Sequence, residues 1–171
     1  MSLSQFENEE VIFDFNPSSS LRSWYSVDDG VMGGISSGSL KISDQGHGLF
    51  EGNISLDYNG GFSSVRYRFD EIRVDPESKV IIKLKGDGKK YQFRVKHNFR
   101  AYYSYIFQLE TSGEWEEIVI PLQEMYPSFR GRKLDLPDFD HQQIEEITFL
   151  IGNKKEEDFQ LLIDKIEVVS K

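Results

Sequence analysis

The stretch that decides the fold is VIIKLKGDGKKYQFRVK, residues 80–96. Apolar side chains alternate with polar, mostly basic ones on both sides of a short turn that contains Gly86 and Gly88. This period of two is typical of a strand with one buried face, and glycine supplies the positive φ that a tight reversal needs. The stretch therefore predicts two strands joined as a β-hairpin.

The same alternation recurs along the chain, in runs rich in Val, Ile, Phe and Tyr that are separated by Gly, Asn, Asp and Ser. Many short strands without intervening helices predict an all-β sandwich of the jelly-roll type. Helical turns are expected only after Pro121 and between Asp138 and Ile144. The predicted strands are residues 11–15, 21–27, 39–42, 47–57, 62–69, 79–86, 90–97, 102–109, 115–120, 144–152 and 159–168.

The length of 171 residues fits one domain, which we place at residues 11–171 after a tail of residues 1–10. Cysteine is absent, which favours a reducing compartment. The chain starts without a secretory leader and contains no apolar run long enough for a bilayer. The sequence therefore predicts a cytoplasmic domain that does not insert into membranes.

Charge is segregated along the chain. The net charge is -9, which disfavours nucleic acid, yet residues 62–100 hold 11 basic and 5 acidic residues. Alternation points the basic side chains of three strands outward, and on one sheet they would form a cationic face for an acidic partner or lipid headgroup. Lysine on a solvated, edge-protecting face is the simpler alternative. These basic residues are Arg66, Arg68, Lys83, Lys85, Arg94 and Lys96.

The most unusual segment is WYSVDDGVMGGIS, residues 24–36. Asp28 and Asp29 could bind a cation or a sugar hydroxyl, with the glycines letting a partner approach the backbone. Alternatively, the aspartates only hydrogen-bond the turn while Val31 and Met32 plug the end of the sandwich. We expect Arg66 to meet both aspartates, because an arginine after a glycine-rich turn can fork onto carboxylates.

Three further features have open interpretations. Asn59-Gly60 is a strong hairpin signal. The loop FRGRK, residues 129–133, is either a solvated turn or an anion or partner contact within the longer loop 128–143. Asp164 either pairs with Asp14 around a structural calcium or faces solvent.

Signatures of catalysis are missing. His47, His97 and His141 show none of the short spacings of metal sites, and no nucleophile elbow or phosphate-binding loop occurs. A glycosidase pair could be drawn only from carboxylates of unknown separation: Asp28, Asp29, Glu51 and Asp57. The sequence predicts no enzyme activity, no cofactor and no metal.

The segment from Trp24 to Ser36, together with Asn59-Gly60-Gly61-Phe62, resembles the complex I intermediate-associated protein family. The resemblance runs from about Val11 onward and implies a galactose-binding-like jelly roll. For eukaryotic members it implies a noncatalytic assembly factor that binds membrane-arm intermediates of respiratory complex I. By this resemblance we expect the chain to be little more than the domain, as in bacterial members. Further matches are Phe50-Glu51-Gly52, Ser64, Arg66, Gly86-Asp87-Gly88, Tyr91, Trp115, Ile120-Pro121, Arg130-Gly131, Ile151-Gly152 and Phe159–Ile166.

We therefore expect a noncatalytic protein-binding domain, an assembly factor or scaffold. The alternative is a carbohydrate-binding module, for which the aromatic platform would be Trp24, Tyr25, Tyr102, Tyr103 and Trp115. A third class is an enzyme that acts through Asp28 and Asp29. The expected binding residues are Trp24, Asp28, Asp29, Met32, Asn59, Arg66, Arg68, Arg94, Arg130 and Arg132.

Overall fold

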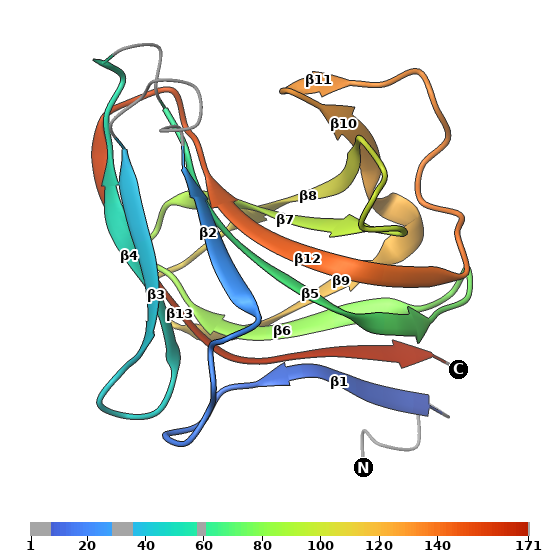
Figure 1. The fold of residues 1–171 in the computed structure, drawn as a ribbon, viewed down its shortest axis with the longest axis horizontal. Helices are drawn as coiled ribbons and strands as arrows, with labels where there is room; N and C mark the ends of the chain where they lie inside the picture. Colours follow the sequence, from blue (N-terminus) through green and yellow to red (C-terminus); the bar gives the residue numbers. More distant parts are fainter. Residues whose placement is uncertain (1–7, 29–35, 58–60, 171) are drawn as a thin grey trace.

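A computed structural model describes residues 8–28, 36–57 and 61–170 of the protein, which are almost entirely strands and loops (Figure 1). A 3₁₀ turn, Leu122–Glu124, follows Pro121 as expected. The strands are β1 (Asn8–Asp14), β2 (Trp24–Asp28), β3 (Ser37–Ile42), β4 (Gly48–Ile54), β5 (Ser63–Arg73), β6 (Lys79–Lys85), β7 (Lys90–Lys96), β8 (Ser104–Glu110), β9 (Trp115–Pro121), β10 (Tyr126–Phe129), β11 (Arg132–Lys133), β12 (Gln143–Ile151) and β13 (Glu157–Ser170).

The strands form two antiparallel sheets packed face to face. The six-stranded sheet has the order β3-β4-β13-β6-β9, and β1 also pairs with β13. The seven-stranded sheet has the order β11-β10-β8-β7-β12-β5-β2. The predicted jelly-roll β-sandwich is therefore confirmed.

The core lies between the two sheets, where the alternating apolar residues meet. Ile82 and Leu84 point inward from β6, and Phe93 and Phe149 point inward from β7 and β12, all of them fully buried. Each such side chain contributes roughly 1.5–3 kcal/mol of hydrophobic free energy. The predicted alternation of these strands is thus confirmed.

The predicted hairpin of residues 80–96 is wrong, because β6 and β7 belong to different sheets. Both edges of β6 are occupied by β13 and β9, so the chain after Lys85 crosses to the other sheet. Asp87 fixes this crossing by accepting hydrogen bonds from the Tyr91 hydroxyl and the Gln160 backbone N–H. Gly86 is required there, since a Cβ would lie 2.2 Å from Thr111.

Two other sequence predictions also fail. The Asn59-Gly60 signal does not make a hairpin, since β4 and β5 lie in different sheets; Asn59 and Gly60 themselves lie outside the described residues. No helix forms between Asp138 and Ile144, where Phe139 instead enters the core. The hairpin β10–β11 was not predicted, because β10 is short and contains Pro127.

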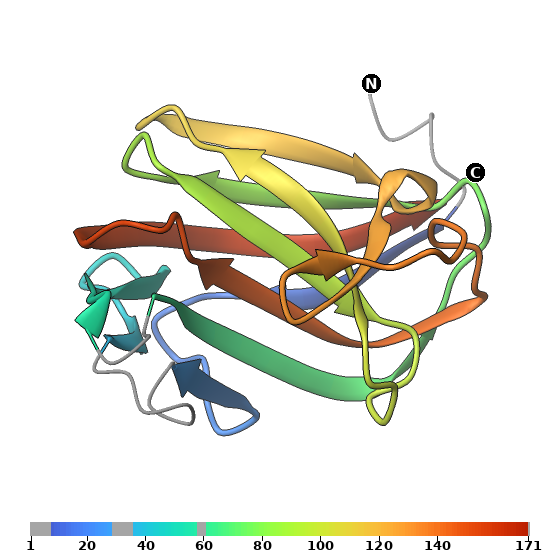
Figure 2. The same cartoon turned by 90° about the horizontal axis from the view of Figure 1, so that it is seen from above.

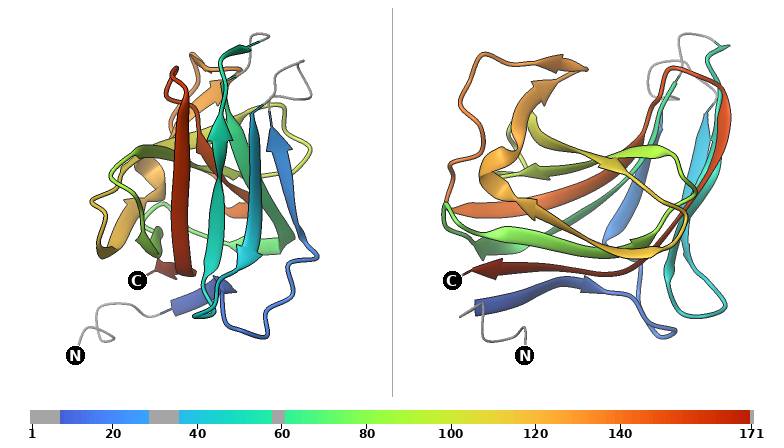
Figure 3. Two further views of the ribbon diagram at one scale, coloured as in Figure 1. Left: turned by 90° about the vertical axis from the view of Figure 1, so that its left-hand side faces the viewer. Right: turned by 180° about the vertical axis from the view of Figure 1, so that it is seen from behind.

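The seven-stranded sheet is curved, and its outer face, the side away from the core, is concave. Figures 1 and 3 show the sheet bending between β2 at one end and the β10–β11 hairpin at the other. Figure 2 looks down onto this face, with β12 running between β5 and β7. The fold therefore presents a curved outer face made of regular strands.

Candidate functional site

The floor of this concave face is formed by side chains that point away from the core and are nevertheless buried. Ile106 on β8 and Glu146 on β12 are each 2% exposed, and Thr148 on β12 is 5% exposed. Their neighbours on the same strands, such as Tyr105, Ile147 and Phe149, belong to the core. Burial on the outer side means that the flanking side chains shield this floor from water.

Strand register arranges the charged side chains of the face in two cross-strand rows. On β5, β12 and β7, Arg66 lies opposite Thr148 and Thr148 opposite Arg94; we call this the arginine row. The next pairs on the same face, two residues further along each strand, form the glutamate row. It consists of Arg68, Glu146 and Lys96.

The glutamate row contains its own carboxylate, Glu146. Glu146 Oε1 accepts a hydrogen bond from the Tyr25 hydroxyl at 2.9 Å and lies 3.4 Å from Nη2 of Arg68. The Arg68 guanidinium also stacks over the ring of Phe99, 4.4 Å from its centroid. Burial and the nearby Glu146 carboxylate raise the pKa of Tyr25. This hydroxyl therefore stays protonated and acts as a donor.

Lys96 closes the glutamate row on β7. Its ammonium donates to the Ala101 carbonyl at 2.8 Å. Burial lowers the pKa of Lys96, and the charges of the neighbouring arginines act in the same direction, whereas Glu146 opposes them. The single carboxylate of the row thus faces two cations.

The arginine row has no carboxylate. Arg94 Nε and Nη2 both donate to the neutral Gln92 side-chain oxygen, at 2.9 and 2.6 Å, and Arg94 forms no ion pair with any residue that the structure describes. Burial, and then the charge of Arg66, lower the pKa of Arg94 to about 10. A desolvated guanidinium without a counter-charge is unfavourable.

Arg66 is the second cation of this row. Its Nε is buried and has no hydrogen-bond partner among the described residues. The Thr148 hydroxyl lies between Arg66 and Arg94 in the register. The row therefore offers unused donors around a central hydroxyl, an arrangement that suits an anion.

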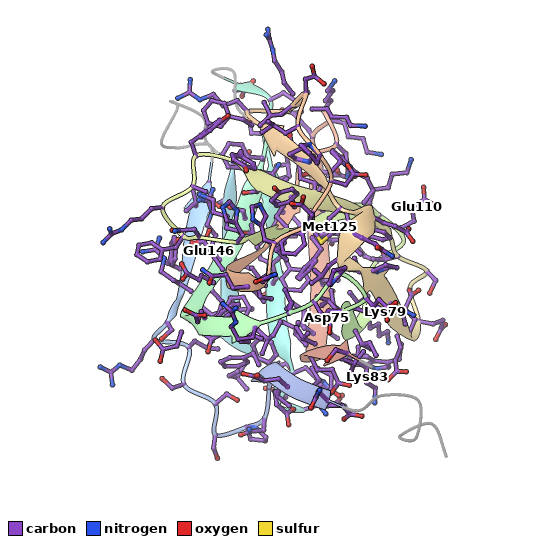
Figure 4. The ribbon with its side chains drawn as sticks, turned by 90° about the vertical axis from the view of Figure 1, so that its right-hand side faces the viewer. Asp75, Lys79, Lys83, Glu110, Met125 and Glu146 are labelled. Carbon is purple, nitrogen blue, oxygen red and sulfur yellow. The ribbon has the colours of Figure 1, made fainter. Side chains whose placement is uncertain are left out.

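Of the basic outer residues predicted to share one sheet, four do so, and the prediction fails for Lys83 and Lys85. These two lysines lie on β6 in the six-stranded sheet, where Lys83 lies 3.8 Å from Asp164. Figure 4 shows Lys83 and Glu146 on separate sides of the molecule. Alternation gives the direction of a side chain within its own sheet, but not which sheet contains the strand.

The expected cluster of Asp28 and Arg66 does not form. The Asp28 carboxylate accepts hydrogen bonds from the Ser63 hydroxyl at 2.6 Å and from the Gly38 N–H at 3.2 Å. It therefore ties β2 to β5 and β3, a structural role that differs from the alternative of hydrogen bonds within the turn. Asp29, Met32 and Asn59 lie outside the described residues.

The other expected binding residues lie apart from the two rows. Trp24 is 7% exposed and stacks on Tyr67 with ring centroids 4.9 Å apart, so it belongs to the core. Arg130 and Arg132 lie at the exposed β10–β11 hairpin, where Arg130 takes the positive φ of 50° at the turn.

The possible aromatic platform is dispersed. Tyr25 lies on β2 of the seven-stranded sheet, whereas Trp115 lies on β9 of the six-stranded sheet and packs against His47. Tyr102 is exposed and meets Phe129 edge to face rather than in one plane. These aromatic residues therefore do not form a single flat surface.

The proposed calcium site of Asp164 is contradicted by its neighbours. Asp164 lies 3.6 Å from His47 and 3.8 Å from Lys83, both of which would compete with a cation. Within the described ranges, no group of three or more His, Asp or Glu side chains could hold a metal ion. In the same ranges, no helix is long and apolar enough to cross a membrane.

Sequence reasoning missed the residues of β12 and one histidine pair. Glu146 and Thr148 interrupt the apolar run 144–151 at alternate positions, which was a usable signal for an outer face. His97 and His141, distant in sequence, stack with ring centroids 3.6 Å apart, and His141 Nε2 lies 2.8 Å from the Tyr105 hydroxyl. No sequence pattern indicates that contact.

The fold is that of the galactose-binding-like jelly rolls. The chain is similar to the family 11 carbohydrate-binding module of Clostridium thermocellum, solved with a mixed-linked tetrasaccharide, with a TM-score of 0.63, 16% identity and coverage of 95% of each chain. A solution structure of CtCBM11 gives a TM-score of 0.71 at the same identity and coverage. A CBM29-2 mutant complexed with cellulohexaose gives 0.57, at 14% identity, covering 95% of this chain and 91% of that one.

The chain belongs to the Complex I intermediate-associated protein 30 (CIA30) family, whose profile matches residues 13–163. It is 24% identical over 148 residues to the mitochondrial Complex I intermediate-associated protein 30 of Drosophila melanogaster. That alignment covers 74% of this chain and 50% of the relative, so the chain spans about half of the relative's length. The resemblance noted from the sequence is confirmed at the level of the family.

Proposed function

We propose that this chain is a noncatalytic protein-binding domain that acts as an assembly factor or scaffold for a multisubunit complex. Its binding surface is the concave outer face of the seven-stranded sheet. The observation that carries the proposal is the arginine row, in which Arg66 and Arg94 are partly buried, on regular strands, without a carboxylate. Rigid strands hold a binding site more accurately than loops do.

Membership of the CIA30 family supports the assembly role, since the named relative associates with intermediates of complex I. A protein partner also fits the charge pattern, because a cationic hollow on a chain with a net charge of -9 steers an acidic partner toward one place. A cytoplasmic location stays a prediction, and the fly relative is named as mitochondrial.

Carbohydrate binding is the alternative. Sugar rings stack on coplanar exposed aromatic side chains. The described face instead offers charged donors and two tyrosines whose hydroxyls are engaged, Tyr25 with Glu146 and Tyr126 with Gln108. The geometry therefore favours a charged partner over a neutral sugar.

The test compares two double variants that remove the same charge from different sheets. Arg66→Gln/Arg94→Gln changes the arginine row, and Lys83→Gln/Lys85→Gln changes the outer face of the six-stranded sheet. Each immobilised protein is cross-linked in an extract of the source organism, and captured proteins are quantified by mass spectrometry.

Wild type and the lysine double variant should capture the same subunits of a membrane-bound complex, and the arginine double variant should lose them. Equal capture by all three proteins would contradict the proposal. Binding of a soluble glucan by the wild type, lost in the arginine double variant, would favour the carbohydrate alternative.

A further inference from the structure

We propose that the arginine row is the seat for a carboxylate side chain from an acidic peptide segment of a partner. This inference rests on the proposed function and names the chemistry that its face recognises. The partner's carboxylate would lie over Thr148, between Arg66 and Arg94.

The first step of the argument is the missing counter-charge. Two residues away on the same three strands, Glu146 lies between Arg68 and Lys96 and supplies that row with a carboxylate. At the equivalent position of the arginine row the residue is Thr148, which is 5% exposed and carries no charge. The fold thus places a carboxylate between the cations of the glutamate row and a neutral threonine between the cations of the arginine row.

The second step is the donor geometry. Neighbouring strands are about 4.8 Å apart, so Arg66 and Arg94 start roughly 10 Å from each other with Thr148 midway. Two guanidinium groups that extend toward each other over this distance can both contact one carboxylate on the outer face. The hydroxyl of Thr148, which lies between them, can donate to the same carboxylate. Among the described residues, Arg66 Nε has no hydrogen-bond partner, and Arg94 donates to a single neutral amide oxygen.

The third step excludes broad polyanions. The floor of the face is buried between flanking elements, as the 2% exposure of Ile106 beside Arg94 in the register shows. A flat lipid surface or a nucleic-acid duplex cannot reach a floor that is shielded in this way. The rest of the chain is also acidic, which repels a polyanion. A peptide is narrow enough to bring one charged side chain to the row.

The probe is a fluorescent peptide with consecutive Glu and Asp residues, and its control is the same peptide with Gln and Asn. Anisotropy titrations are run with wild type, Arg66→Gln/Arg94→Gln and the matched Lys83→Gln/Lys85→Gln variant. Loss of charge-assisted hydrogen bonds should weaken acidic-peptide binding by about 10-fold or more in the arginine variant. The lysine variant should bind within about two-fold of wild type, and the amide peptide should not bind.

Several outcomes would overturn the carboxylate seat. These are equal weakening by both double variants, no binding of the acidic peptide, or tighter binding of inorganic phosphate than of the peptide at the arginine row. Sedimentation with phosphatidylserine vesicles that depends on Arg66 and Arg94 would also overturn it. The single variant Arg94→Met, which removes a charge that the fold does not neutralise, repeats the comparison if the double variant does not fold.

The two proposals fail in different ways. If the seat is wrong and the function right, partner capture depends on Arg66 and Arg94 while the acidic peptide does not bind. If the function is wrong and the seat right, the peptide binds through the row while capture from the extract is the same for every variant.

Discussion

The arginine row and the glutamate row lie on the same three strands, as successive pairs on one face of the sheet. Both carry a cation on β5 and on β7. They differ in the residue that β12 contributes, which is Glu146 in one row and Thr148 in the other. The glutamate row is held together by its own charges, and the arginine row is not. The difference separates a structural ion cluster from cations that are available to an external anion.

The largest expected effect comes from removing the charge that neutralises the glutamate row. Glu146→Gln leaves the four cations of the two rows without a carboxylate among them, so the free energy of unfolding should fall by about 2 kcal/mol. The loss is smaller than the ~3–5 kcal/mol of a fully buried pair because the Arg68 side chain is 47% exposed. Urea unfolding measures it. The control Glu110→Gln, in an exposed pair with Lys90, should change stability by less than about 0.5 kcal/mol.

The second prediction has the opposite sign and breaks the comparison if it fails. Arg94→Met removes an uncompensated cation and keeps an apolar stem over the floor, so the free energy of unfolding should rise by about 1 kcal/mol. Arg68→Met, in the glutamate row, should instead destabilise the protein by stranding Glu146. Thermal denaturation distinguishes the two variants, and destabilisation of similar size in both would show that the rows are equivalent.

The smallest effect concerns pH at the end of the glutamate row, where His97 follows Lys96. Burial, and then the charge of His141, lower the pKa of His97, whereas Glu145 and Asp140 oppose this shift. The folded state therefore favours neutral His97, and its contribution to stability is present above the unfolded pKa of about 6.5 and is lost as pH falls below it. Unfolding measured from pH 7.5 to 5 should show this decline, reduced in His97→Gln. An unchanged pH profile in that variant would assign the decline to other groups.

The sequence was sufficient for the fold class and for the direction of most side chains, because period-two burial is a local property of each strand. It failed at residues 86–90, since a turn rich in glycine can join two strands of one sheet or cross between sheets. Which of the two occurs depends on the partners of β6, namely β13 and β9, which are contributed by distant parts of the chain.

The candidate site was predicted in part for the same reason. Arg66, Arg68 and Arg94 were expected on an outer face, and they lie there. Their separation into two rows is set by β12, which follows β7 only after β8 to β11 and inserts between β5 and β7. The neutralising role of Glu146 follows from that insertion and has no local sequence signal.

The pairing of the first and last strands makes the domain nearly closed on itself. Asn8 lies opposite Ser170 in the register, so the chain enters and leaves the six-stranded sheet at one point (Figure 1). A short linker could join these positions and new ends could be opened at the exposed Arg130–Gly131 turn, which would give a circular permutant with the same two sheets. Since β1 and β13 both lie in the sheet opposite the two rows, the domain could also be inserted as a cassette into another polypeptide without covering the concave face.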